Sequence, residues 1–252
     1  ADRRYHGWQA AAPAEAESEH AACIGTKRLA RRRTERAGNG LIGTSQLQAG
    51  NLPAFSISAM PILHCGRFRL PLNRPLVMGI VNLTPDSFSG DGAGTNVDRA
   101  LRHARSQLDA GADILDIGAE SSRPGALSTP EEEELRRLLP VLREITTWGV
   151  PVSVDTYKPA VMRAALAAGV AMINDITALG HSGALEVVAA SDCAICLMHM
   201  SGEPGTMQLA PRYDDVVGEV WAFLAARVAN CRAAGIADDR LVLDPGFGFG
   251  KT

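Results

Sequence analysis

Short apolar runs alternate with longer helical segments between residues 76 and 244, and no other feature constrains the fold as strongly. Each run is almost continuously apolar, as a strand buried on both faces requires. The predicted strands are LVMGIVN (76–82), DILDIG (113–118), VPVSVD (150–155), VAMIND (170–175), CAICLM (193–198) and RLVLD (240–244). The predicted helices lie near 96–110, 130–147, 158–168, 183–190 and 212–234. A repeated strand-helix unit predicts an α/β fold with a parallel sheet.

Local signals mark the ends of the predicted helices. Ser128-Thr129-Pro130 precedes four glutamates, which predicts a helix start with a capping residue, a proline in the first turn and acids at the positive end of the dipole. Gly169 and Gly235 stand where glycine commonly ends a helix.

The chain divides at Met60, its first methionine. Residues 1–59 are Ala-rich, then basic over 27–36, then rich in small polar residues, without sustained apolar periodicity. We expect them to form a disordered or non-native N-terminal extension. Residues 60–252 form the predicted folded domain, which opens with a short hairpin over 62–70.

Charge and composition exclude several classes of protein. The predicted domain carries a formal net charge of −6, whereas nucleic-acid-binding domains are basic. No run of eighteen apolar residues exists, which argues against a membrane span. Five scattered cysteines do not indicate a disulfide scaffold, and a reducing cytoplasm is the expected location. Cys193 and Cys196 have the spacing of a redox or zinc pair, but in a strand they would point to opposite faces.

Polar residues occupy the predicted carboxyl ends of all six strands. They are Asn82, Asp116, Asp155, Asn174 with Asp175, His199 and Asp244. Any one of them is explained equally well as a helix cap, but the whole series is not. Reactive groups of barrels and open α/β sheets gather at this edge. Carboxylates and amides there suit a flat ligand rich in N–H donors. Ser121, Ser122 and His199 lack the G-x-S-x-G turn of a serine nucleophile.

The terminal GFGFGKT is similar to a phosphate-binding loop, but the match fails. Counting back from Gly250-Lys251-Thr252, the position of the first required glycine holds Pro245, which has a fixed φ and no N–H. We interpret the stretch as a tight turn after the last predicted strand.

Five stretches, in order and in spacing, closely resemble the dihydropteroate synthase family of bacterial folate biosynthesis, which sulfonamides target. They are MGIVNLTPDSFSGDG (78–92), DIGAESSRPGA (116–126), PVSVDTYKPAVMRAALAAGVAMINDI (151–176), CLMHMSGEPGTMQ (196–208) and LVLDPGFGFGK (241–251). The resemblance implies a TIM (β/α)8 barrel. It also implies a transferase that joins 6-hydroxymethyl-7,8-dihydropterin diphosphate to para-aminobenzoate with Mg2+, releasing pyrophosphate and 7,8-dihydropteroate.

The resemblance also assigns roles to individual residues. Asn82 contacts the metal and the diphosphate, Ser122 and Arg123 bind the diphosphate, and the loops holding Pro85 to Gly92 and Ser121 to Gly125 close over para-aminobenzoate. The pterin-binding residues are Asp155, Asn174, Asp175 and Asp244, with Met198 and Phe247 packing on the ring. The residues expected to act in catalysis are Asp116 and Asp155, which stabilise positive charge on the pterin methylene, and Arg123, which neutralises the leaving group.

The sequence departs from the family at several places. Ala119 replaces a customary glycine, Ser121-Ser122 replaces Ser-Thr, and SFSGDG replaces SFSDGG. Two later family strands, bearing Ser-Arg-Lys and Arg-x-His, have no counterpart, so we expect about six βα units of the barrel and no turnover by the chain alone. A family-like homodimer is expected to lack its late helices. The alternatives are a methyltetrahydrofolate-corrinoid methyltransferase of the same fold and a non-catalytic pterin binder.

Overall fold

The computed structural model describes residues 22–24, 61–84, 93–120, 128–202 and 211–251. One sheet in this part of the chain has the strand order β1-β4-β5-β6-β7-β8-β9. Its strands are β1 (Ala22–Ile24), β4 (Leu76–Asn82), β5 (Ile114–Gly118), β6 (Val152–Asp155), β7 (Met172–Asp175), β8 (Ala194–Met198) and β9 (Leu241–Asp244). Neighbours from β4 to β9 are parallel and follow one another in chain order, whereas β1 pairs antiparallel with β4.

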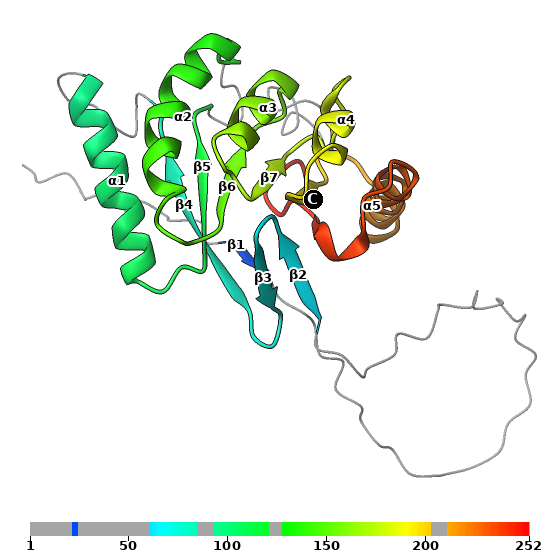
Figure 1. Cartoon of the computed structure of the whole chain (residues 1–252). Coiled ribbons are helices and arrows are strands. Elements are labelled where there is room, and N and C mark those ends of the chain that lie inside the picture. The colour runs from blue at the N-terminus through cyan, green and yellow to red at the C-terminus, as the bar shows by residue number, and fades with distance from the viewer. Residues whose placement is uncertain (1–21, 25–60, 85–92, 121–127, 203–210, 252) are drawn as a thin grey trace, which may run out of the picture.

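Helices connect the parallel strands and lie along the outside of the curved sheet (Figure 1). They are α1 (Ala93–Asp109), α2 (Glu131–Ile145), α3 (Pro159–Ala167), α4 (Ala184–Ala189) and α5 (Val216–Ala233), with the short 3-10 helix η2 (Asp238–Arg240) before β9. The predicted α/β class, the six parallel strands, the five helices between them and their order are confirmed. The arrangement is that of the first part of a (β/α)8 barrel.

Two hydrophobic layers hold the sheet. On its outer face, strand residues such as Ile117, Val154 and Ile173 pack against helical residues such as Leu142 of α2. On its inner face, a smaller cluster contains Ile114, Met172 and Ala194. Successive side chains of a strand point to opposite faces, so these two lists fix which residues point into the barrel.

The predicted hairpin is formed by β2 (Ile62–Cys65) and β3 (Phe68–Pro71), and it covers the amino-terminal end of the sheet. Leu63 and Cys65 belong to the inner cluster. The Cys65 thiol donates a hydrogen bond to the carbonyl of Ala171, which precedes β7, and the Gly66 N–H donates to the carbonyl of Asp192, which precedes β8. The hairpin therefore occupies the end opposite to the polar strand tips.

Cys193 and Cys196 are packing residues of the fold. Cys193 belongs to the outer cluster and Cys196 to the inner one, and both are buried and free. The prediction that they point to opposite faces is confirmed, and Cys193 and Cys196 form no redox pair.

The helix-end signals were partly correct. Gly169 and Gly235 end their helices with φ of +91° and +83°. The prediction of a capping side chain for α2 was wrong, because the N-cap residue is Pro130 and no side-chain cap bond forms. Ser128 and Thr129 instead bond to the connection between β6 and α3. The predicted extension over 1–59 lies outside the described residues, apart from β1.

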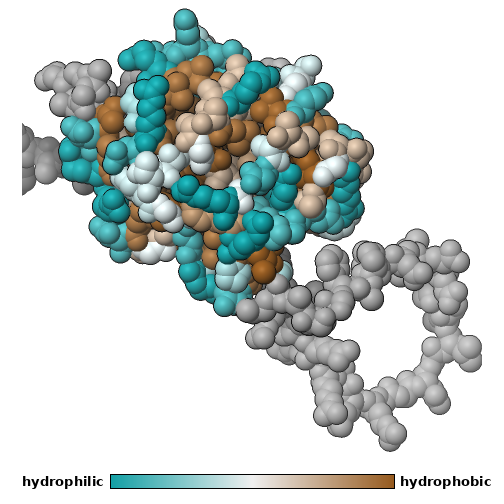
Figure 2. All heavy atoms as spheres, viewed as in Figure 1, coloured by the Kyte–Doolittle hydropathy of each residue, from teal (hydrophilic) through white to brown (hydrophobic). Residues whose placement is uncertain are grey.

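The helical layer carries a mixed surface. In the view of Figure 2, hydrophilic side chains are interspersed with the hydrophobic ones over the helices. Within the described residues, no helix combines the length and apolar character that a membrane span needs.

Candidate active site

Three polar side chains lie in one row at the carboxyl end of the sheet. The register pairs Asn82 of β4 with Gly118 of β5, Gly118 with Asp155 of β6, and Asp155 with Asn174 of β7. Lateral partners in a parallel sheet face the same side. Met172, two residues before Asn174, belongs to the inner cluster, so the row points into the barrel. We call Asn82, Asp116, Asp155 and Asn174 the inner polar set.

Gly118 leaves room for the polar heads on either side of it. A Cβ atom at this position would lie 3.3 Å from Asn82 Oδ1 and 3.7 Å from Asp155 Oδ2. The carboxamide of Asn82 and the carboxylate of Asp155 thus converge over a residue without a side chain.

Asp116 lies one level deeper on the same face of β5. It is 4% exposed, and its Oδ2 accepts a hydrogen bond of 3.0 Å from Asn174 Nδ2. Its Oδ1 has no hydrogen-bond partner among the described residues. Burial raises the pKa of Asp116, although the neighbouring Ser153 hydroxyl and then the hydrogen bond from Asn174 oppose the shift. A buried acceptor without a donor inside the barrel is a feature that a bound ligand would satisfy.

Asp155 is the most strongly perturbed carboxyl of this set. Burial raises its pKa well above the ordinary value, and the negative charges of Asp116 and Asp175 raise it further. A ligand that donates N–H groups to this carboxylate would stabilise its charged form. Strongly perturbed titratable groups of this kind cluster at functional sites.

Strands β8 and β9 add Met198 and Asp244 to the carboxyl edge of the sheet. Met198 of β8 pairs with Asp244 of β9, and Met198 is 4% exposed. Asp244 Oδ1 accepts a hydrogen bond of 2.7 Å from the Gly246 N–H, which starts the turn after β9. Gly246 has φ of +67°, and a Cβ atom there would lie 2.1 Å from the carbonyl oxygen of His199. Only glycine fits at this position.

The terminal lysine holds this turn. Lys251 Nζ donates hydrogen bonds of 3.0–3.1 Å to the carbonyls of His199, Gly246 and Phe249. Burial lowers its pKa, although the charge of Asp244 opposes the shift. All three ammonium hydrogens are thus used within the protein. This confirms that GFGFGKT is a tight turn rather than a phosphate loop.

Not every predicted site residue joins the inner polar set. Asp175 follows Asn174 in β7, and it lies on the opposite face, fully buried. It accepts hydrogen bonds from the N–H groups of Thr177 and Leu179 and from the Thr177 hydroxyl. Phe247 is 85% exposed. Ser122 and Arg123 lie outside the described residues, as do the predicted loops at 85–92 and 121–125.

His199, at the end of the predicted strand, faces the helices. Its ring meets the ring of Phe223 in α5 edge-on, with centroids 4.9 Å apart. Burial and then the charge of Lys251 lower its pKa, so the imidazole is neutral at pH 7.

A second polar cluster beside the inner polar set was missed by the sequence analysis. It is centred on Lys158, whose ammonium group contacts Glu120, Glu134 and the carbonyl of Thr129. One signal was present in the sequence. Glu134 shares the helical period of the buried residues Leu138 and Leu142, so it was predictable as a buried carboxyl.

The described residues hold no group of three or more His, Cys, Asp or Glu side chains that could bind a metal ion. The inner polar set has acceptors for N–H donors in Asp116 and Asp155, and the Asn82 carboxamide lies in the same row as Asp155. It contains no Ser, Cys or Lys nucleophile. Such a site can bind and polarise a flat nitrogen-rich molecule.

A comparison with protein families agrees with this geometry. The family described as "Pterin binding enzyme" matches residues 78–252, which include every residue of the inner polar set.

Two similar proteins are dihydropteroate synthases of bacteria. The dihydropteroate synthase of Neisseria meningitidis serogroup C is 54% identical over 197 residues, which are 77% of this chain and 70% of the relative. The dihydropteroate synthase of Escherichia coli K12 is 50% identical over 184 residues, which are 73% of this chain and 65% of the relative.

Two solved structures show the same fold. The dihydropteroate synthase of Burkholderia cenocepacia, complexed with 7,8-dihydropteroate, is 51% identical with a TM-score of 0.69, and the match covers 77% of this chain and 67% of that one. The enzyme of Xanthomonas albilineans, with 4-aminobenzoic acid, is 52% identical with a TM-score of 0.71, and the match covers 77% of this chain and 69% of that one.

Proposed function

Because the chain belongs to the dihydropteroate synthase family of pterin-binding enzymes, we propose that its inner polar set binds a dihydropterin for condensation with para-aminobenzoate. The reaction is a group transfer, in which 6-hydroxymethyl-7,8-dihydropterin diphosphate and para-aminobenzoate give 7,8-dihydropteroate and pyrophosphate. The observation that carries the proposal is the pair of carboxyls with raised pKa, the buried Asp116 and the half-buried Asp155, together with Asn174, which donates to Asp116 and lies beside Asp155 in the register.

Asp116, Asp155 and Asn174 of the set fit the amino-substituted edge of a pterin. That edge presents several N–H donors, and the free Oδ1 of Asp116 and the carboxylate of Asp155 are acceptors for them. Asn174 offers its carbonyl oxygen while its amide remains bonded to Asp116. Met198 and Asp244 extend the same binding surface, with Met198 against the ring face.

Asn82, at the β4 end of the row, fits the diphosphate. Asn82 supplies one oxygen near Asp155, and Mg2+ commonly takes one or two protein oxygens, substrate phosphate oxygens and water. We propose that Asn82 would hold Mg2+ together with the diphosphate, where the ion would supply positive charge to balance the leaving group. Ser122 and Arg123 are proposed to bind the same group.

The residues make chemical sense of the transfer. The methylene C–O bond breaks and diphosphate leaves with the electron pair, so positive charge develops on the methylene and the pterin ring. The carboxylates of Asp116 and Asp155 stabilise this charge electrostatically. The amino nitrogen of para-aminobenzoate then forms the new C–N bond and releases a proton to solvent. Phe247 and Asp175 are not needed for these steps.

Location and assembly follow from the same proposal. The cysteines at 65, 193, 196 and 231 are free and buried, which fits a reducing cytoplasm. A homodimer stays a prediction of the family resemblance. The corrinoid methyltransferase alternative is disfavoured, because the relatives and structures compared above are dihydropteroate synthases.

Binding of 6-hydroxymethyl-7,8-dihydropterin by isothermal calorimetry tests the proposal directly. Asp155→Asn should weaken this binding roughly 10- to 100-fold, because it removes a charged acceptor for ligand N–H groups. The matched control is Asp238→Asn, which changes an exposed carboxylate paired with Arg232 far from the set. Equal affinity in Asp155→Asn and the control would refute the assignment, and an unaltered chain that binds no dihydropterin would refute the function.

A further inference from the structure

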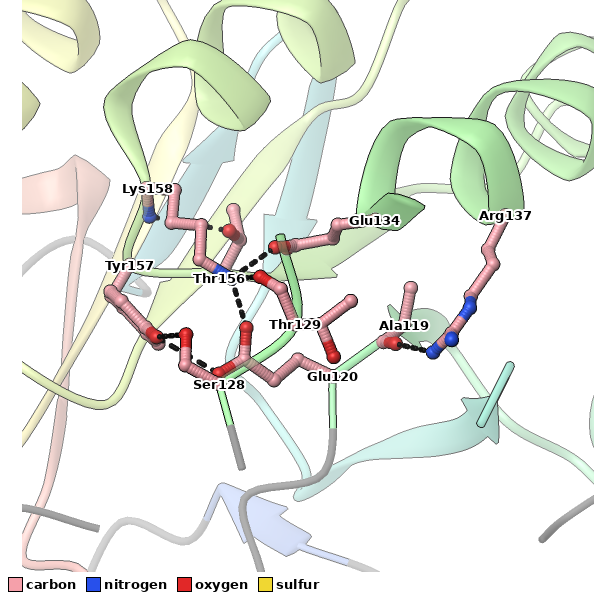
Figure 3. Close-up of polar contacts among 9 residues, drawn as sticks. All are labelled: Ala119, Glu120, Ser128, Thr129, Glu134, Arg137, Thr156, Tyr157 and Lys158. Atoms are coloured by element: carbon pink, nitrogen blue, oxygen red, sulfur yellow. Dashed lines mark hydrogen bonds and ion pairs between the residues drawn. The ribbon is translucent and has the colours of Figure 1, made fainter. Parts of the chain in front are cut away.

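The second polar cluster joins three parts of the chain at the carboxyl edge of the sheet. Figure 3 shows the Lys158 ammonium group between the carboxylates of Glu120, just after β5, and Glu134 of α2. Nζ donates 2.7 Å hydrogen bonds to Glu134 Oε2 and to the Thr129 carbonyl, and it also donates to Glu120 Oε2. Every hydrogen of the ammonium group therefore has an acceptor.

Tyr157, like Lys158, bonds to residues on both sides of segment 121–127. Its hydroxyl lies 2.9 Å from Glu120 Oε1 and 2.9 Å from Ser128 Oγ. Glu120 is the last described residue before segment 121–127, and Ser128 is the first one after it. Tyr157 thus bonds to the residue on each side of that segment. Lys158 does the same through Glu120 and Thr129, so two adjacent residues hold both flanks at one place (Figure 3).

The same two residues are fixed to the inner polar set. Asp155 ends β6, and the next residue, Thr156, donates its N–H to the Asn174 carbonyl at 3.0 Å. Lys158 precedes Pro159, the first residue of α3, and has the extended backbone that a following proline favours. Its N–H donates to Thr156 Oγ1 at 3.3 Å. The connection from Asp155 to α3 is therefore a short, internally bonded arm.

Stability alone does not account for this cluster. The Lys158 side chain is 10% exposed and Glu134 is 1% exposed, and two carboxylates share one ammonium group. Glu134 Oε1 has no hydrogen-bond partner among the described residues. Buried ion clusters commonly stabilise a fold no better than apolar residues of the same volume. What they add is a defined geometry, here between the flanks of 121–127 and the arm that carries Asp155.

We propose that Tyr157 and Lys158 are positioning residues that fix Glu120 and Ser128 relative to Asp155 and thereby set the affinity for the diphosphate group of the substrate. Neither residue touches the substrate. The inference rests on the proposed function, in which Ser122 and Arg123 bind the diphosphate. Because both flanks are tied to the arm bearing Asp155, diphosphate and pterin are recognised in one fixed relation.

The test compares two ligands that differ only in the diphosphate. Affinities for 6-hydroxymethyl-7,8-dihydropterin diphosphate, with Mg2+, and for 6-hydroxymethyl-7,8-dihydropterin are measured by calorimetry in Tyr157→Phe, Ser128→Ala and the double variant. Each single variant should lose roughly three- to tenfold in affinity for the diphosphate ligand and nothing for the other. The double variant should lose less than the product of the two, because both remove one shared hydrogen bond.

Arg136→Gln is the matched control, since it removes an exposed ion pair on α2 away from the arm. It should leave the ratio of the two affinities unchanged. A purely structural role for Tyr157 would lower both affinities together with the thermal midpoint, and that result would overturn the proposal. An unchanged ratio of the two affinities in Tyr157→Phe would overturn the proposal as well, but it would leave the proposed pterin site intact. If the unaltered chain binds neither ligand, the proposed function fails and this inference with it.

Discussion

The two carboxylate clusters at the carboxyl edge differ in what neutralises them. In the second cluster, Glu120 and Glu134 share the ammonium group of Lys158. In the inner polar set, Asp116 and Asp155 form no ion pair with any described residue, and burial raises the pKa of each. The clusters are joined by one short arm, so the contrast is local. Of these two clusters, the one centred on Lys158 therefore has a cation for its carboxylates, whereas the inner polar set, which we propose binds a ligand, has none.

Removing the cation from the paired cluster should have the largest effect. Lys158→Met keeps the length of the side chain but leaves Glu134 buried without its partner. We expect a loss of about 3–5 kcal/mol in the free energy of unfolding, measured by urea denaturation. Burial alone would lower the pKa of Lys158, but its bonds to Glu120 and Glu134 outweigh burial and raise it, so the group is charged at neutral pH.

The control for this variant is Arg74→Met. It breaks the pair with Asp113 at a site where the arginine side chain is 59% exposed, and it should change stability far less. If Lys158→Met were as stable as Arg74→Met, the second cluster would be no more important to the fold than a surface pair, and the contrast would disappear.

A smaller effect on stability should distinguish Asp175 of β7 from Asp155 of β6. Asp175 faces outward and accepts the Leu179 N–H at 2.9 Å, which holds Ala178 and Leu179 at positive φ of 52° and 60°. Asp175→Asn places an amide where an acceptor is needed, so we expect a loss of about 1–3 kcal/mol of stability. The dihydropterin affinity of the folded variant should stay unchanged.

Calorimetry on Asp175→Asn beside Asp155→Asn would settle this point. A fall in affinity equal to that of Asp155→Asn would place Asp175 in the binding site, as the sequence prediction had it. The structure places its carboxylate in the turn after β7 instead.

The particular residues show what the sequence can and cannot reveal. The bounds of β4 were predicted correctly because an apolar run ends at a polar residue, and the remaining strands differ by one or two residues. The start of α5 lies at Val216 rather than near 212, because Asp215 accepts from the Gly218 N–H and begins the helix there. Local chemistry was thus sufficient for the strands and nearly so for the helices.

The site was predictable only in part. The strand-end rule brought Asn82, Asp155 and Asn174 to one edge, and the register confirms that they form one row. The two-residue period of a strand already separates Asn174 from Asp175, but the prediction did not use it. The bond from Lys158 to Glu120 joins residues 38 apart in the chain, and no local pattern reveals such a contact.

The smallest expected effect of the unpaired inner carboxylates is on the pH dependence of the free energy of unfolding. Because the folded pKa of Asp155 is raised, the native state binds a proton that the unfolded state has lost, so stability falls as pH rises above about 4 toward the raised pKa. The slope from one such group is at most about 1.4 kcal/mol per pH unit. Glu133 changes stability with pH in the opposite direction, and over a lower pH range. Its hydrogen bonds to Arg136 and Arg137 lower its pKa to about 2, so its contribution is lost only as pH falls from about 4.5.

Urea denaturation between pH 4 and 8 measures this slope. Asp155→Asn removes the titrating group, so the slope above pH 4 should flatten and the variant should be more stable than the unaltered chain at neutral pH. A dihydropterin that donates N–H groups to the Asp155 carboxylate should lower its pKa, so binding in this range should release protons, seen as a dependence of the binding heat on buffer ionisation. An Asp155→Asn variant with the same slope would mean that the inner carboxylates carry no cost of burial. The distinction between paired and unpaired clusters would then have no energetic basis.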